Sequence, residues 1–84
     1  MNINAASTQL ENGIRAAFSA EKIGCHIIKT IRGPRTLTAA LRLYEPDVKT
    51  LARVARMGQS IEARAGVSPI RVTSQAGIVY AEAP

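Results

Sequence analysis

Cys25 and His26 are adjacent, and a thiol beside an imidazole is the pair of groups that cysteine-based nucleophilic catalysis uses. The residues from Cys25 to Ile31 are rich in β-branched side chains and predict a strand, in which consecutive side chains point to opposite faces. A dyad within hydrogen-bond distance is therefore not expected. Because the chain has one Cys and one His, a zinc site would also lack ligands.

Other patterns that carry chemistry are equally sparse. The sequence contains no Gly-rich P-loop that would cradle ATP phosphates. Its six Asp and Glu residues are scattered, with no obvious pair on one element for general acid and base catalysis. We therefore predict that the chain alone is not an enzyme and that it has no cofactor, no metal and no small-molecule substrate.

The basic residues are the more informative set. Eleven Lys and Arg face six Asp and Glu, which gives a formal net charge of +5 and a pI near 10.2. Such an excess favours a polyanionic partner, although a solvated basic surface that maintains solubility has the same composition. A predicted second helix carries four basic residues within about 80° of arc, opposite its apolar stripe. These are Lys49, Arg53, Arg56 and Arg64.

Two further guanidinium groups, those of Arg32 and Arg35, flank a predicted hairpin turn at Gly33-Pro34. A hairpin tip of this kind can reach phosphates or enter a groove. Charged residues also decorate turns that bind nothing. The chain has only three aromatic residues, and a domain that reads single strands usually interleaves more of them with its basic groups. Contact with the backbone of a DNA duplex is therefore the preferred interpretation.

The elements that must position these residues follow from periodicity. A first helix is predicted from about Thr8 to Ala20, with Thr8 and Glu11 as a capping box and with an apolar stripe. Strands 25–31 and 37–43 form an antiparallel hairpin, a second helix covers 48–65, and strands 69–73 and 77–82 follow. The order α-β-β-α-β-β predicts one α+β domain over residues 1–84. Its mainly antiparallel four-stranded sheet carries both helices on one face.

The run from Lys22 to Pro34 resembles a segment of the FtsK/SpoIIIE family of DNA translocases. In that family a helix, a strand, a Gly-Pro turn and a second strand precede the motor domain. A Pro-x-Val-Lys element then leads into a helix, and here it is Pro46-Asp47-Val48-Lys49. The closing strands of the family segment correspond here to Ile70-Arg71-Val72 and Gly77-Ile78-Val79.

One family feature is missing. Where the family often has a Thr-Arg-aromatic-Glu run, this chain has Leu37-Thr38-Ala39-Ala40. The resemblance, which covers about Leu10 to Ala81, implies an accessory domain that packs with like domains into a ring around DNA and couples to a motor ATPase domain.

The leading hypothesis is thus a non-catalytic accessory domain of a DNA translocase that contacts double-stranded DNA or packs with copies of itself. One alternative is a protein-interaction or homo-oligomerisation module without nucleic-acid binding, in which Tyr44, Ile28 and Tyr80 would be contact residues if exposed. Another is a small RNA-binding domain. A lone cysteine forms no internal disulfide and no apolar run is long enough to span a bilayer, so we expect a cytoplasmic protein with no membrane span in this chain.

Overall fold

The computed structural model describes residues 3–84, with side-chain placement from residue 5. Three helices and four strands follow in the order α1 (Ile3–Ala20), β1 (Cys25–Arg32), β2 (Leu37–Leu43), α2 (Val48–Ala55), α3 (Gly58–Ala65), β3 (Arg71–Gln75) and β4 (Ile78–Ala83). The sheet is antiparallel throughout, with strand order β1-β2-β4-β3. The predicted α+β class and the β1–β2 hairpin are confirmed.

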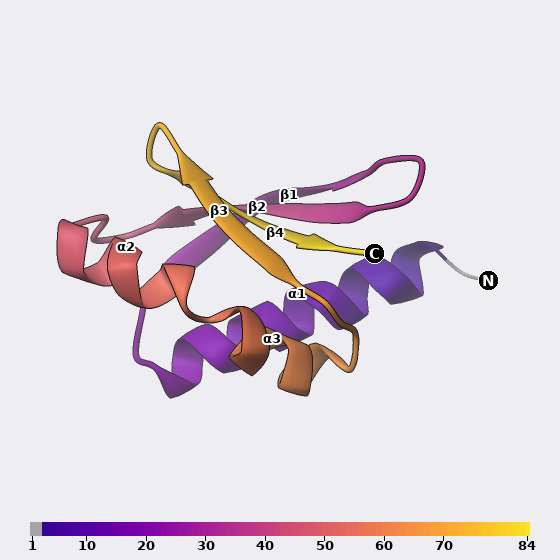
Figure 1. Ribbon diagram of the computed structural model, residues 1–84, viewed down its shortest axis with the longest axis horizontal. Coiled ribbons are helices and arrows are strands. Elements are labelled where there is room, and N and C mark those ends of the chain that lie inside the picture. Colours follow the sequence, from indigo (N-terminus) through magenta and orange to yellow (C-terminus); the bar gives the residue numbers. More distant parts are fainter. Residues whose placement is uncertain (1–2) are drawn as a thin grey trace.

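All three helices lie on the same side of the sheet (Figure 1). The core between the two layers is one cluster, and the predicted stripe of α1 supplies four of its members, namely Leu10, Ile14, Ala17 and Phe18. The alternating residues Leu37, Ala39, Leu41 and Leu43 of β2 face the same cluster. One face of the sheet is therefore covered by helices, and no helix of residues 3–84 lies on the opposite face.

The first helix begins earlier than the capping-box prediction placed it. It starts at Ile3, so Thr8 lies inside the helix and cannot cap its end. Ala5 and Ala6 have high helix propensity, and they allow the helix to extend toward the N-terminus. Glu11 accepts a hydrogen bond from Thr30 Oγ1 at 2.6 Å and pairs with Arg15 at 3.6 Å, so its carboxylate links α1 to β1.

The second helix is not continuous, which corrects the prediction of one helix over residues 48–65. The α-helical pattern stops at Ala55, where Arg56 and Met57 donate backbone hydrogen bonds three residues back to Arg53 and Val54. This turn buries Met57 in the core, and Gly58 then starts α3 against the carbonyl of Ile70. A Cβ on Gly58 would lie 2.8 Å from that oxygen, so glycine is required for the close approach.

Asp47 caps α2, as the sequence indicates. Its Oδ1 accepts a hydrogen bond from the Thr50 backbone N–H at 2.7 Å, and this bond lowers the pKa of the exposed Asp47 carboxyl. Because the pKa is lower in the folded than in the unfolded state, the stabilisation is complete above the unfolded pKa, which is about 3.9. It is lost as the pH falls through the folded value.

We expect Asp47→Ala to lower the urea midpoint at pH 7 and Asp47→Asn, which keeps an acceptor oxygen, to lower it less. The gap between Asp47→Ala and the wild type should close as the pH falls through the pKa of Asp47, measured by circular dichroism during urea unfolding. Glu45→Ala is a matched control, because Glu45 is a nearby exposed acid. An Asp47→Ala midpoint equal to that of the control at pH 7 would contradict the capping role.

Candidate nucleic-acid interface

The basic residues predicted on the second helix are all exposed, but the structure does not place the four on one helix. Lys49 and Arg53 lie on α2, Arg56 follows its last residue, and Arg64 lies on the separate helix α3. The arc calculated for one continuous helix therefore does not hold for Arg64, and Arg56 lies outside α2. Arg32 and Arg35, also exposed, lie at the β1–β2 turn, which occupies the opposite end of the long axis from α2 (Figure 1).

Acidic side chains accompany the basic residues on the helical side of the molecule. Arg53 Nη2 donates to the backbone carbonyl of Glu21 at 2.8 Å and lies 3.4 Å from the Glu21 carboxylate. Asp47 and Glu45 immediately precede α2. The positive potential of α2 is therefore partly offset by three carboxylates, which a reading of one helix at a time does not reveal.

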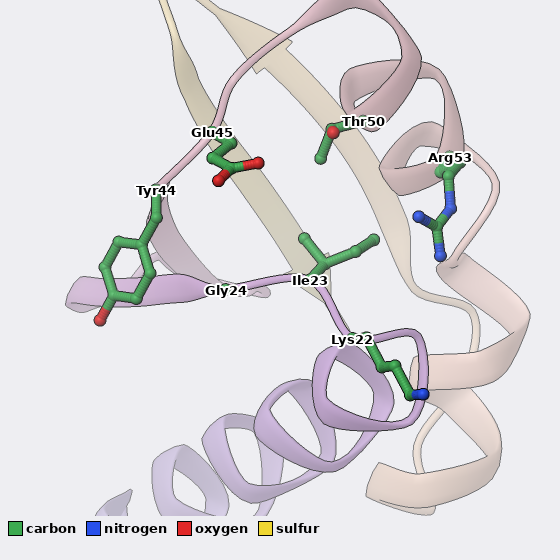
Figure 2. A pocket seen from close by; sticks show the side chains of 7 residues that line it. All are labelled: Lys22, Ile23, Gly24, Tyr44, Glu45, Thr50 and Arg53. Atoms are coloured by element: carbon green, nitrogen blue, oxygen red, sulfur yellow. The ribbon is translucent and has the colours of Figure 1, made fainter.

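A hollow of about 260 Å³ lies between the end of α1, the β2–α2 loop and α2. Figure 2 shows Lys22 in the turn after α1 and Arg53 on α2, while Glu45 and Tyr44 come from the β2–α2 loop. Thr50 adds a hydroxyl. Arg53 is already bonded to Glu21, and the acid Glu45 also lines this hollow. The hollow therefore has a mixed charge and does not select an anion.

The helix-free face of the sheet, here called the open sheet face, carries three residues from each strand. The strand register places Ile31, Thr38, Glu82 and Arg71 in one row, Lys29, Ala40, Tyr80 and Thr73 in the next, and His26, Arg42, Ile78 and Gln75 in the third. Burial agrees with this arrangement, because the alternate residues Ile27, Leu41, Val79 and Val72 pack in or against the core. A bulge at Ile28 shifts the register of β1 and leaves that side chain exposed.

Charge divides unequally between the strands with their β1–β2 turn and the helices with their loops, although Arg32 pairs with the core-facing Leu37 and so does not belong to the open sheet face. The strands and the β1–β2 turn carry five Lys and Arg against one acid, Glu82; the five are Lys29, Arg32, Arg35, Arg42 and Arg71. The helices and the loops joined to them carry the other six Lys and Arg against five acids. Most of the net charge of +5 therefore belongs to the sheet and its hairpin turn.

The five basic residues of the sheet and its turn are exposed, and among residues 3–84 the ion pairs are Arg15–Glu11 and Arg53–Glu21, both on the helical side. Four of the five helical-side acids accept hydrogen bonds: Glu11, Glu21, Asp47 and Glu62. The acids are thus engaged in holding the fold together, whereas within residues 3–84 the sheet cations form no ion pair, and Glu82, opposite Arg71, is the one acid among them. Such an arrangement suits a polyanion.

Tyr80 occupies the middle of the open sheet face. Its neighbours across the strands are Ala40 and Thr73, both short, and it is half-buried. A hollow of about 330 Å³ lies beside it, lined by Thr38, Arg71, Thr73, Gln75, Tyr80 and Glu82. The site therefore combines an aromatic ring, hydroxyl and amide groups, a guanidinium and a carboxylate in one concave surface.

Cys25 and His26 are placed as the strand prediction requires. Cys25 packs against the core and is half-buried, whereas His26 is exposed on the open sheet face. Burial raises the pKa of the Cys25 thiol, and the charge of Arg15 offsets this only in part, so the reactive thiolate is disfavoured. The described residues contain no group of three or more His, Cys, Asp and Glu side chains placed to hold a metal ion.

The sequence reasoning missed Lys29, Arg42, Arg71 and Tyr80 as members of one surface. The alternation of β2 predicts a wetter face that includes Arg42, but the strand order that brings β3 and β4 beside it is not readable from the alternation. Of the residues considered for a protein-interaction surface, Tyr44 and Ile28 are exposed and Tyr80 is half-buried.

Comparison with models of protein families, with curated proteins and with solved structures yields no match. Within residues 3–84, no helix combines the length and apolar character needed to cross a bilayer.

Proposed function

We propose that this chain is a non-catalytic accessory domain of a cytoplasmic DNA translocase, as its resemblance to the FtsK/SpoIIIE family implies. In this proposal it contacts double-stranded DNA without sequence preference, and the contact surface is the open sheet face with its hairpin turn. The α2 surface proposed from the sequence takes a secondary part, because its acids offset its basic residues.

The observation that carries the proposal is the division of charge. Five exposed Lys and Arg lie on the strands and the β1–β2 turn against the single acid Glu82. Exposed ammonium and guanidinium groups bind phosphate oxygens, and each phosphate that they neutralise releases condensed counterions. Contacts of this kind fix the position of the protein on the duplex and do not distinguish one base sequence from another.

The hairpin extends the surface along the molecule. Its turn lies at one end of the long axis, and the principal extents are 38 × 24 × 19 Å. B-DNA carries one phosphate charge per about 1.7 Å of axis, so a surface of this length faces several phosphates at once. Arg32 and Arg35 at the tip and Lys29, Arg42 and Arg71 behind it supply five contacts at most.

Fluorescence anisotropy of a labelled 20-base-pair duplex, titrated with the protein at several salt concentrations, tests the proposal. We expect the logarithm of the binding constant to fall with the logarithm of salt concentration with a slope of about −3 to −4.5. Two duplexes of unrelated sequence should bind with equal affinity. Failure to bind either duplex at low salt would refute the proposal.

A further inference from the structure

We infer that the hollow beside Tyr80 holds one unpaired DNA base, so that the domain binds a duplex with an unpaired stretch more tightly than a fully paired duplex. This inference rests on the proposed DNA contact at the open sheet face and adds a position that recognises a base. The occupant is a nucleotide of the same DNA whose phosphates the surrounding basic residues contact.

The neighbours of Tyr80 leave space for a base. On the β3 side its partner Thr73 is short, exposed and part of the lining of the hollow, whereas Ala40 on the β2 side is buried and does not line it. The hollow that results measures about 330 Å³. This lies at the small end of the range for ligand sites, about 300–1,000 Å³, which suits one nucleotide rather than a larger molecule.

The polar lining matches the chemistry of a nucleotide. Gln75 offers both a donor and an acceptor, Thr38 and Thr73 offer hydroxyl groups, and Glu82 offers acceptor oxygens to the edge of a base. Arg71 lines the same hollow and can donate to the phosphate of the same nucleotide. A base stacked on Tyr80 adds attraction that depends little on base identity.

The charge around the hollow decides between possible occupants. The lining itself is mixed in charge, because Arg71 and Glu82 both contribute to it, and the excess positive charge comes from Lys29 and Arg42 on the strands beyond Tyr80. A second copy of this chain would bring the same positive charges face to face, which is unfavourable. A nucleotide brings the opposite charge. A paired base must unstack and unpair before it reaches the ring, which costs free energy, so an unpaired base is favoured.

Anisotropy with three labelled duplexes tests the inference: one fully paired, one with a bulge of three unpaired thymidines, and one with an abasic bulge that has the same phosphates. The thymidine bulge should bind about tenfold more tightly than the other two. Tyr80→Leu should abolish this preference, whereas Tyr80→Phe should keep it. Tyr44→Leu is the matched control, since Tyr44 lies outside the open sheet face.

Tyrosine fluorescence gives a second readout that needs no change at Tyr80. The chain has two Tyr and no Trp, so Tyr44→Phe leaves Tyr80 as its one tyrosine fluorophore. We expect the thymidine bulge to quench this emission and the abasic bulge to leave it unchanged. Circular dichroism should confirm that each variant is folded.

The results separate this inference from the proposed function. Binding of the paired duplex without a preference for the thymidine bulge, and without quenching, would overturn the inference and leave the proposed function standing. A tenfold preference for single-stranded RNA over the bulged DNA would overturn the assignment to DNA. A protein that binds no paired duplex at low salt would instead refute the proposed function.

Discussion

Replacing Gly13 by valine is expected to lower the free energy of unfolding by about 3 kcal/mol, because α1 and α3 touch through their backbones at this point. Gly13 is buried on α1, and a Cβ there would lie 2.5 Å from Ala65 Cβ, 2.7 Å from its Cα and 2.8 Å from its nitrogen. Two of these three atoms belong to the backbone, so no rotamer change relieves the overlap. The helices would have to separate and open the core around Ile14 and Ile61.

Gly13→Ala gives the sharper test, because two effects have opposite signs. Alanine in a helix interior is favoured over glycine by about 1 kcal/mol. The overlap with Ala65 should exceed this gain, so we expect a net loss of about 1–2 kcal/mol. Urea unfolding followed by circular dichroism measures both variants. If the Gly13→Ala variant were as stable as the wild type, or more stable, the two helices would not approach each other so closely.

Two controls isolate the helix–helix contact. Ala16→Val lies on the exposed side of the same helix and should cost only the propensity difference, at most about 0.7 kcal/mol. Ala65→Gly in the Gly13→Ala background removes the Cβ on α3 and should restore only part of the stability, since the overlap with the Ala65 backbone persists. Complete restoration would mean that the Cβ atoms alone limit the approach.

The second large effect concerns DNA. Reversing Lys29 and Arg42 to glutamate should weaken duplex binding on the order of 100-fold at low salt and reduce the salt slope by about 2. Both residues lie on the open sheet face, and neither has an acid as its direct cross-strand partner. The variant therefore creates no new pair of like charges across the strands. Anisotropy at several salt concentrations gives both quantities.

Lys49→Glu with Arg56→Glu is the matched control, because it makes the same change in net charge on the helical side. Both residues are exposed, and Arg53 is left with its bonds to Glu21. We expect a loss of about tenfold or less, owing to the changed field of the whole molecule. If this control variant lost as much duplex affinity as the Lys29 and Arg42 variant, binding would depend on the net charge of the whole molecule and not on one surface. A larger loss of affinity in the control variant than in the Lys29 and Arg42 variant would place the DNA interface on α2.

Periodicity predicted those parts of the fold in which neighbours along the chain decide the outcome. The buried stripe of α1 follows from spacing alone, since one helical face must leave water whatever it packs against. The β1–β2 hairpin follows from two apolar strands and a Gly-Pro turn. The break between α2 and α3 does not follow, because it depends on Met57 entering the core and on Gly58 meeting the carbonyl of Ile70, a residue of a later segment.

The same distinction applies to the candidate interface. The sequence by itself determined the excess of positive charge, the α+β class and the sparsity of catalytic motifs, because composition and local spacing suffice for these. Only the tertiary structure decided where that charge is effective. The strand order β1-β2-β4-β3 gathers Lys29, Arg42, Arg71 and Tyr80 on one face, while the turn after α1 places Glu21 beside Arg53 of α2. Electrostatic fields depend on distances in space, and residues far apart in the chain set those distances.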